Sequence, residues 1–564
     1  MNEKHLTARE TTLLWATSIV FLVSSAMFLL PNIERLGLYY DEAFIAQQAR
    51  DFLEPGRENL HPASVRSIEW FGRPFPIRNA AYLGSLKSQL LIPAFWIGGA
   101  TVKTLRIATF GIAALALVLT LFWSRRVFSL PIALLGGALV ATDPSFLFFG
   151  RFEWGPFTTN FLCRAAGLLF LTWAWQSSSP IRRRIAAVGG GLALGLGIYS
   201  RADFTLIVAA AGLGILVGHP ALVGKIIRTR KTEAALAFGA LAVASLPMWS
   251  SALSLITVSG SIADRGDFID RLAVLWNVLD GTQFLRVMQS GGLFDQSRSL
   301  DLQGGLLGLA LIGSLLIVGF QLIQERRSSP ETAADDPRRW LWITTVTILL
   351  TTLALPGAVR AHHHLNALPF VQILIACAFE VLWRYGKQSN QVWPRFATVI
   401  VLAGVIASQL LIVVGTEKEI LRTSGFGRWN PTLAVLADEL EATPGSEVIS
   451  LDWGFHEPLL FLTHDLPLQE AIWSIPRAFA AGRPWTHDGN GQTHYLIHAA
   501  PYDAFGLSDP LLRFARQRPP DQVAVRAWSS PDGQVDFYSI RFRQPHRLSY
   551  VGSGRFRLDD REGS

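Results

Sequence analysis

Two adjacent carboxylates follow the first long apolar run of the chain, in the stretch Gly37-Leu-Tyr-Tyr-Asp-Glu42. Apolar residues recur after them at roughly helical spacing, which predicts a short helix along a membrane surface with Asp41 and Glu42 at its start. A half-buried carboxylate has a raised pKa and can take a proton from a hydroxyl group, so Asp41 is a candidate general base. The alternative is that Asp41 caps the helix and Glu42 offsets its dipole, and for the pair taken alone this explanation is slightly favoured.

Other ionisable side chains occur where further apolar runs end, and the predicted topology places them on the same membrane face as Asp41. They are Lys87, Asp143, Arg151, Glu153, Arg201, Asp203, Arg360, His362, His363 and His364. Charged groups at such depths are costly and tend to mark a site or an ion pair. For any one of them alone, a helix-end charge or a local salt bridge is the more frequent explanation. Their convergence on one face is the stronger argument for a site.

The composition predicts a polytopic membrane protein. Half of the 564 residues are hydrophobic and only 16% are charged, with 18 Trp and 35 Phe. The net charge of +7 does not indicate nucleic-acid binding, because the basic residues lie in short clusters between apolar runs, where they set membrane orientation. Cys163 and Cys377 both lie inside apolar runs, which excludes a disulfide framework and a thiolate metal site.

About eleven membrane spans are predicted from the lengths of the apolar runs. They are 12–30, 106–123, 130–142, 157–175, 185–199, 203–218, 234–253, 301–323, 340–356, 366–383 and 396–414. The short loops on one side hold most of the Lys and Arg residues, for example those at 176–184 and 324–339, so that side is predicted to be cytoplasmic. The loop at about 31–105, which carries Asp41 and Glu42, is then external and lies along the membrane.

The chain is predicted to have two domains, a membrane domain at 1–415 and an external soluble α/β domain at 416–564, where polar turns alternate with short β-rich runs. The second domain contains its own set of polar residues, which leaves open that it performs the chemistry and that the spans only anchor it. These are Asp452, His456, Glu457, His464 and Asp465. They match no metal-ligand spacing, and a strand followed by a turn and a helix explains them equally well.

Several of these motifs resemble those of the C-type superfamily of membrane glycosyltransferases, and within it the protein O-mannosyltransferase and aminoarabinose-transferase branch. The resemblance covers residues 10–220 and, more loosely, residues 362–369. It lies in Asp41-Glu42 after the first span, Tyr82-Leu-Gly-Ser-Leu-Lys87, Leu105-Arg106, and Asp143-Pro144 ahead of Arg151-Phe-Glu153.

The resemblance implies an inverting transfer of a sugar from a polyprenyl-phosphate donor to a hydroxyl acceptor, which is a lipid, a glycan or a protein. Asp41 matches the catalytic acidic position of the superfamily, Glu42 its partner, and Glu153 the second acidic motif. Lys87 matches a lysine that faces the donor phosphate, although the prolines that usually follow it are absent. Further contacts to the phosphate are expected from Arg201 and Arg360, and contacts to the substrates from Tyr40, Tyr82, His363 and His364.

No cofactor is expected to be required, although several relatives place a divalent ion near the acids and the three histidines add possible ligands. The predicted location is the inner cell membrane, with the site on the periplasmic side. A competing function is a multi-span transporter or flippase of lipids or sugars. Transporters usually have symmetric halves with broken helices near the membrane midplane. Because the polar groups here gather at one face, an enzyme is favoured.

Overall fold

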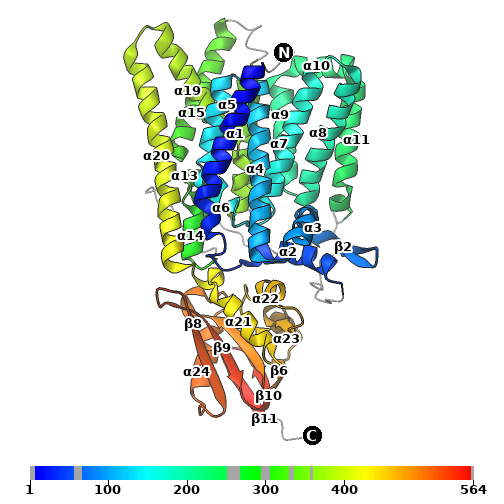
Figure 1. The fold of residues 1–564 in the computed structure, drawn as a ribbon, viewed down its shortest axis with the longest axis vertical. Coiled ribbons are helices and arrows are strands. Elements are labelled where there is room, and N and C mark those ends of the chain that lie inside the picture. The colour runs from blue at the N-terminus through cyan, green and yellow to red at the C-terminus, as the bar shows by residue number, and fades with distance from the viewer. Residues whose placement is uncertain are drawn as a thin grey trace.

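The computed structural model describes residues 7–55, 66–250, 267–293, 305–328, 336–355 and 360–560. Long, nearly parallel helices form a bundle, and a smaller domain that contains β-sheets lies beyond one end of it (Figure 1). The N-terminus lies at the opposite end of the bundle (Figure 1).

Each predicted span falls on a helix of the bundle. The helices are α1 (Ala8–Leu29), α4 (Val102–Val127), α5 (Leu130–Ala141), α7 (Phe157–Gln176), α8 (Pro180–Ser200), α9 (Phe204–Gly218), α11 (Lys231–Trp249), α15 (Leu307–Ser328), α17 (Pro337–Ala354), α19 (Phe370–Gln388) and α20 (Val392–Thr423). The start of the predicted span 301–323, the end of 234–253 and the last residue of 340–356 lie outside the described residues.

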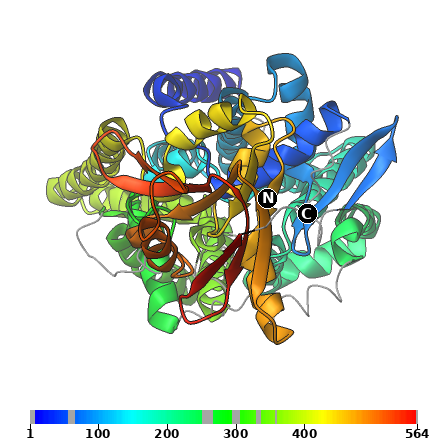
Figure 2. The same cartoon turned by 90° about the horizontal axis from the view of Figure 1, so that it is seen from below.

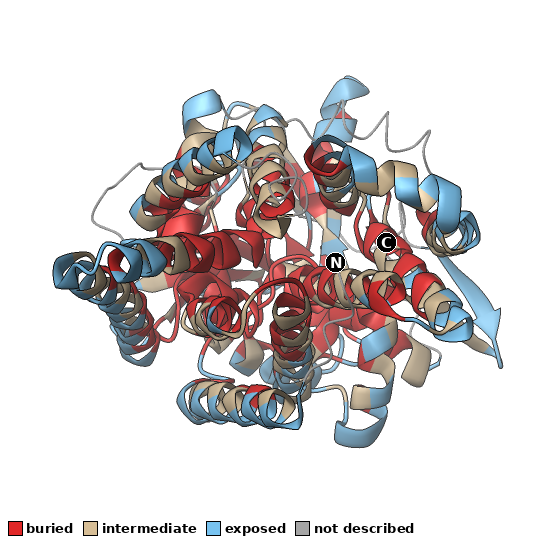
Figure 3. Cartoon of the chain, turned by 90° about the horizontal axis from the view of Figure 1, so that it is seen from above, coloured by how far each residue is buried: buried red, intermediate tan, exposed pale blue. Residues whose placement is uncertain are grey.

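The outer surface of this bundle suits a lipid environment. By length and composition, six spans within the described residues can cross a membrane, and a seventh results if α9 and α10 (Pro220–Thr229), which are bent by 99°, form one span. Buried residues face the middle of the bundle and exposed ones face outward (Figure 3). The outward positions include Met27, Phe238 and Leu411, which are each more than 70% exposed. Since water would disfavour so much exposed apolar surface, the chain is a multi-pass membrane protein.

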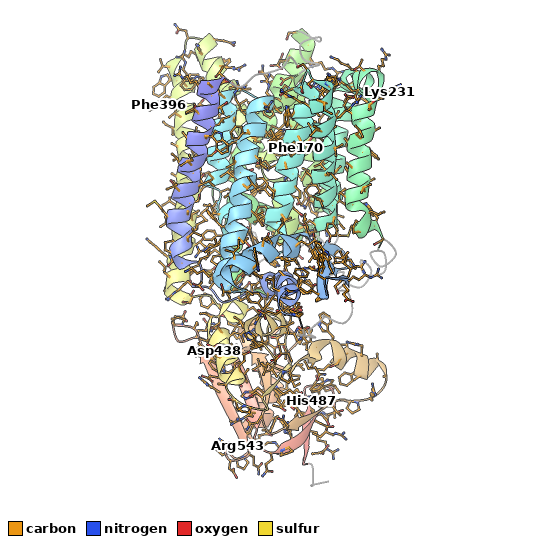
Figure 4. The ribbon with its side chains drawn as sticks, turned by 45° about the vertical axis from the view of Figure 1, so that its right-hand side comes forward. Phe170, Lys231, Phe396, Asp438, His487 and Arg543 are labelled. Carbon is orange, nitrogen blue, oxygen red and sulfur yellow. The ribbon has the colours of Figure 1, made fainter. Side chains whose placement is uncertain are left out.

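The basic loops lie together at the end of the bundle that is remote from the sheet-containing domain. Lys231 is at this end, whereas Asp438, His487 and Arg543 lie in the other domain (Figure 4). An ion pair of 2.5 Å between Glu10 and Arg125 joins the start of α1 to the end of α4 at this face. The structure thus gathers on one face the loops that the charge pattern assigns to one side.

The segment between α1 and α4 crosses the other end of the bundle, next to the sheet-containing domain (Figure 1). It consists of α2 (Tyr40–Leu53), β1 (Arg66–Trp70), β2 (Arg73–Ala80), β3 (Leu83–Gly84) and α3 (Leu86–Gly98). The strands form an antiparallel sheet in the order β1-β2-β3. Phe71 and Gly72, both at positive φ, make the two-residue turn between β1 and β2.

Shorter helices complete this end of the membrane domain. They are α6 (Pro144–Phe149), α13 (Phe268–Asp280), α14 (Gln283–Gln289) and α18 (Ala361–His364). The helix α6 begins at Asp143, whose carboxylate accepts from the Phe146 N–H at 3.2 Å and from Gln372 at 2.7 Å. Asp143 therefore caps α6 and ties it to α19.

The C-terminal domain is an α/β domain, as predicted. Its five-stranded sheet has the order β5-β4-β7-β9-β8, in which β5, β4 and β7 are parallel and β9 and β8 are antiparallel to their neighbours. A second antiparallel sheet has the order β11-β10-β6. The strands are β4 (Glu447–Ser450), β5 (Leu468–Glu470), β6 (Trp485–Asn490), β7 (Thr493–His498), β8 (Val523–Ser529), β9 (Val535–Phe542), β10 (Pro545–Tyr550) and β11 (Phe556–Asp560). The helices are α21 (Thr432–Glu441), α22 (His456–Leu462), α23 (Ser474–Ala480) and α24 (Ser508–Arg516).

The junction between the two domains differs from the predicted boundary at residue 415. Helix α20 continues through that position and ends at Thr423. Polar residues begin at Thr416, but Glu417 remains buried because it pairs with the buried Arg151. This ion pair supports the helix beyond its apolar part.

Candidate active site

Asp41 lies in the first turn of α2, and it is not the capping residue of this helix. The N-cap is Tyr39, whose backbone N–H donates to a carboxylate oxygen of Glu42 at 3.3 Å. The sequence predicted that Asp41 could cap this helix, but the side chain that accepts from the N-cap backbone is that of Glu42. This arrangement leaves the Asp41 carboxylate available for other contacts.

The Asp41 carboxylate faces donors and cations from three distant parts of the chain. It accepts a hydrogen bond from the Gly155 backbone N–H, and Arg360 and Arg201 both act on it electrostatically. Burial is the largest effect and raises the pKa of Asp41 to about 6, although the two arginines oppose it. A carboxylate with this pKa is ionised at neutral pH and is still basic enough to take a proton from a hydroxyl group.

Arg201 is held by a small polar network where α8 ends and α9 begins. Its Nε lies 3.2 Å from Oδ1 of Asp203, and its Nη2 lies 3.0 Å from Nδ1 of His363. His363 Nδ1 is also 3.0 Å from Oδ2 of Asp203, which Asn366 approaches at 3.3 Å. These contacts fix the guanidinium group next to Asp41.

Glu42 does not share this environment with Asp41. It is 3% exposed and forms a two-pronged ion pair with Arg106, with distances of 3.1 and 2.9 Å. Arg106 also donates to the backbone carbonyls of Ile33, Leu36 and Gly37, each at 2.8 Å. The structure therefore assigns Glu42 to holding the start of α2, whereas the sequence suggested a supporting acid that orients Asp41 or binds the sugar.

Lys87 and Glu153 form a second buried ion pair, at 2.5 Å. Lys87 is 1% exposed, and its ammonium group also donates to the hydroxyls of Thr109 at 2.9 Å and Thr158 at 3.1 Å. Glu153 in turn accepts from the backbone N–H and the hydroxyl of Thr158. All three donors of Lys87 are therefore used within the protein. Lys87, the predicted phosphate ligand, and Glu153, the predicted second acidic motif, are therefore each other's partner in this structure.

The four predicted substrate contacts lie in different surroundings. Tyr82 is 38% exposed and therefore lies at the rim of the site. The charges of Asp41, Arg360 and Arg201 all act on its hydroxyl group. His363 belongs to the Arg201 network. Tyr40 packs on Trp453 of the C-terminal domain with ring centroids 4.8 Å apart, and His364 is buried to 1% exposure. The structure brings Tyr82 and His363 to the site, and it directs Tyr40 towards the domain interface.

The polar residues of the C-terminal domain do not all gather into one site, although Asp452, His456 and Glu457 act electrostatically on Glu470. Asp452 is fully buried and accepts from His498 at 2.9 Å and from Arg428. His456 contacts Glu457 at 3.2 Å, while His464 is exposed and contacts Glu441 at 3.4 Å. Asp465 is exposed next to it. This distribution argues against the interpretation in which the spans only anchor a catalytic C-terminal domain.

Two contributors to the site were not singled out from the sequence. Gly155 has φ of +66°, and its N–H reaches Asp41, while a Cβ at this position would lie 3.5 Å from Arg201 and 3.7 Å from His362. The Trp-Gly-Pro run that follows Glu153 is a turn signal that would have indicated it. Asp203 was noted only as one charge among several, and its spacing of two residues from Arg201 is the available signal.

Among the described residues, no group of three or more His, Cys, Asp or Glu side chains is arranged to hold a metal ion. The rings of His362 and His363 lie close together, with centroids 4.5 Å apart. His362 faces Trp154 with ring centroids 5.8 Å apart, and His363 faces Asp203. Two of the possible histidine ligands are therefore neighbours, but they belong to no group of three or more such side chains in the described part of the chain.

Comparisons with known proteins give structural matches. No family model matches the chain, and no curated protein gives a significant sequence match. ArnT from Cupriavidus metallidurans, crystallised with undecaprenyl phosphate, has a TM-score of 0.51 at 13% identity, over 95% of this chain and 98% of that one. The Archaeoglobus fulgidus oligosaccharyltransferase AglB, in complex with an inhibitory peptide and a dolichol-phosphate, has a TM-score of 0.55 at 15% identity, over 94% and 74%. The oligosaccharyltransferase from the same organism in complex with Zn and sulfate has a TM-score of 0.50 at 17% identity, over 80% and 62%.

ArnT and AglB align with this chain over almost its whole length. TM-scores of 0.51 and 0.55, at identities of only 13–15%, show a common fold. The chain thus has the fold of ArnT and of the Archaeoglobus fulgidus oligosaccharyltransferase, which agrees with the fold that the resemblance of its motifs predicted.

Proposed function

We propose that the chain is an integral-membrane glycosyltransferase that moves a sugar from a polyprenyl-phosphate donor to a hydroxyl acceptor on the external face, with inversion. The observation that carries this proposal is the position of Asp41. It is a carboxylate with a raised pKa, at the membrane surface, next to Arg201 and Arg360. A base and two cations are what such a transfer needs at one place.

In the proposed reaction, the acceptor hydroxyl attacks the anomeric carbon from the side opposite the phosphate. The new bond joins the acceptor oxygen to the anomeric carbon, and the bond from that carbon to the phosphate oxygen breaks. Asp41 takes the hydroxyl proton, and polyprenyl phosphate leaves with the bonding electron pair. Arg201 and Arg360 stabilise the negative charge that develops on the leaving phosphate, a role for which fixed cations are effective. Tyr82, at the rim, is placed to contact the incoming substrate.

The donor class is inferred from two sources. The fold is shared with proteins crystallised with undecaprenyl phosphate and with dolichol-phosphate. The two arginines near Asp41 offer guanidinium groups, which pair well with phosphate. Of the phosphate ligands predicted from sequence, Arg201 and Arg360 are now preferred to Lys87, since the Lys87 ammonium is already paired with Glu153.

The decisive experiment compares wild-type membranes with membranes that carry Asp41→Asn, each incubated with a set of labelled polyprenyl-phosphate sugars. Asn keeps the size of the side chain and an acceptor oxygen for the Gly155 N–H, but it is not a base. We expect the wild type to consume one donor and the variant to lose about 10²–10⁴-fold in rate. A folded Asp41→Asn variant with near-normal transfer would remove Asp41 from the mechanism. Translocation of an intact donor without loss of its sugar would instead identify a transporter.

The same assay tests the proposed ionisation of Asp41. Because the base must be deprotonated, the rate should rise with pH, pass its half-maximal value near pH 6, and level off above it. The residual rate of Asp41→Asn should lack this rise. A chelator added to the wild-type assay determines whether a divalent ion takes part.

A further inference from the structure

A cavity of about 470 Å³ lies outside the candidate active site, between the β1–β2 hairpin and the external end of α11. The hairpin contributes Arg66, Ser67 and Arg78 to its lining, and α11 and the residue after it contribute Pro247 and Ser250. Two cations and two hydroxyl groups therefore face one hollow of a size that suits a small polar group.

Arg78 is the residue that indicates a ligand. It is 7% exposed, it lines the cavity, and its Nε has no hydrogen-bond partner in the described part of the chain. The strand register places Arg66 directly opposite Arg78, so a charge of the same sign acts on Arg78. A buried guanidinium beside a second one is costly unless an anion compensates for it.

The hairpin that carries these arginines has exposed apolar residues that suit a membrane interface. Trp70 and Phe71 at its tip are 47% and 87% exposed, and Ile68 is 55% exposed. It extends sideways near the ends of the bundle helices (Figure 1), and it reaches the edge of the molecule when seen from the side of the C-terminal domain (Figure 2). Exposed aromatic rings at this level occur where proteins meet the lipid headgroup layer.

We propose that this cavity binds the phosphate of a lipid headgroup in the external leaflet, with Arg66 and Arg78 on the phosphate and the aromatic tip in the interfacial layer. Guanidinium groups suit phosphate because they present paired N–H donors. Ser67 and Ser250 offer hydroxyl groups to the same headgroup. The observations behind this site are independent of Asp41, so it can be tested whether or not the proposed transfer reaction is correct.

The site is also connected to the candidate active site through the backbone. The Ile77 carbonyl accepts from the Tyr199 hydroxyl at 2.6 Å, and the Tyr82 carbonyl accepts from the Ala202 N–H at 3.1 Å. Leu83 of β3 bridges to Arg201. A headgroup held by β2 would therefore steady the strands that hold Tyr82 and Arg201 in place.

The test uses the full-length protein in detergent and measures its melting temperature while three probes are added separately. These are short-chain phosphatidylglycerol, short-chain phosphatidylcholine and inorganic phosphate. The variants are Arg78→Gln and Arg66→Gln, and the control is Lys103→Gln, which removes an exposed charge at the start of α4. We expect phosphatidylglycerol to stabilise the wild type and the control with equal affinity. Each arginine variant should bind it about tenfold more weakly, as the loss of one charge-assisted hydrogen bond predicts.

Each alternative result has a defined meaning. Equal binding of phosphatidylglycerol to the wild type and to both arginine variants would overturn the proposal. Stabilisation by inorganic phosphate at the same concentration would overturn the lipid part and indicate a site for the free anion. Arg66 is exposed, so Arg66→Gln is expected to fold even if Arg78→Gln does not, and its lipid affinity then decides the outcome.

Discussion

The burial of the Asp41 carboxylate lowers the stability of the folded protein at neutral pH. Its pKa is raised from 3.8 to about 6, because burial disfavours the charged form more than Arg360 and Arg201 favour it. The folded state therefore holds the Asp41 proton more tightly than the unfolded state does. Stability from this group is complete below about pH 4 and is lost as the pH rises through about 6. Such a cost is common at functional positions.

The first prediction follows from the direction of the pKa shift of Asp41. Asp41→Asn should make the folded protein more stable than the wild type at pH 7, by about 1–3 kcal/mol, since one pKa unit corresponds to about 1.4 kcal/mol. At pH 4 the difference should be much smaller, because Asp41 is then protonated in the folded state and partly protonated in the unfolded state. Melting temperatures in detergent at the two pH values measure this, with Lys103→Gln as a neutral surface control. A variant that is less stable at pH 7 would mean that the charged carboxylate is structurally required.

The second prediction separates the two possible roles of Lys87. Lys87→Met alone should destabilise the protein by about 3–5 kcal/mol, because Glu153 is left buried without its partner. The double variant Lys87→Met/Glu153→Gln should recover most of this loss. If Lys87 only pairs with Glu153, the double variant also recovers the use of the donor. A recovered melting temperature with a persistently raised KM for the donor would show that Lys87 contacts the phosphate.

Only some of the contacts between site residues could be predicted from the sequence, and the reason is physical. Asp41, Arg201 and Arg360 could be grouped from sequence, since membrane topology alone puts their helix ends on one face. The pairs Glu42–Arg106 and Lys87–Glu153 could not, because they depend on how α2, α3, α4 and the loop before α7 are rotated against each other. Hydropathy gives the number and direction of helices, but it carries no information on their rotation.

At the scale of elements, a single side chain holds the segment before α2 in position. Arg106, near the start of α4, donates to three backbone carbonyls between Ile33 and Gly37 and also to Glu42. It is fully buried and lies over the ring of Phe152, at 4.7 Å from the ring centroid. Arg106, which belongs to α4, therefore helps to fix the position of Asp41 in α2.

The third prediction is that Arg106→Lys loosens this segment while the charge is kept. Lysine has three donors on one atom and cannot span the separate acceptors that the guanidinium group reaches. Amide hydrogen exchange should accelerate at residues 33–42, and the transfer rate should fall although Asp41 is intact. Arg35→Lys is the matched control, because Arg35 is exposed and donates to the Leu421 carbonyl at 3.1 Å without reaching α2. Unchanged exchange in Arg106→Lys would contradict this role.

The elements themselves were predicted more accurately than their ends. The apolar runs indicated every bundle helix, since a membrane requires a long continuous apolar segment. The end of α20 was misplaced, because the Glu417–Arg151 pair extends the helix past its apolar part. The β1–β2 hairpin was not predicted, because its strands are short and contain two prolines and several charges.

At the scale of the whole molecule, the two domains form one continuous packed unit around the start of α2. Tyr39 stacks on Trp429 with ring centroids 4.2 Å apart, and Tyr40 packs on Trp453. Arg428 donates to the carbonyls of Trp453 at 2.8 Å and of Tyr502 at 3.0 Å. Removing the C-terminal domain would uncover the fully buried Tyr39, so point variants are a cleaner test of its role than truncation.

The fourth prediction concerns orientation. The loops with clustered arginines lie at the end of the bundle opposite the C-terminal domain, and we propose that they are cytoplasmic. In intact cells, a cysteine placed at Ser178 or Ser328 should resist a membrane-impermeant thiol reagent. A cysteine at Asp521, in an exposed turn before β8 of the C-terminal domain, should react. Labelling of a cysteine at position 178 from outside would reverse the arrangement and would place Asp41 on the cytoplasmic face.

The contact between Tyr39 and Trp429 also has a consequence for the order of biosynthesis. All the bundle helices after α1 lie between these residues in the sequence, and the Gly37 N–H donates to the Trp429 carbonyl at 2.7 Å. During synthesis the first span emerges early, but the start of α2 cannot reach its final packing until α20 has been inserted and the residues after it have been released. The proposed catalytic carboxylate therefore becomes fully positioned only in a chain that has been translated past its last helix. An interrupted product would carry Asp41 without the packing that places it, and would be inactive for that reason.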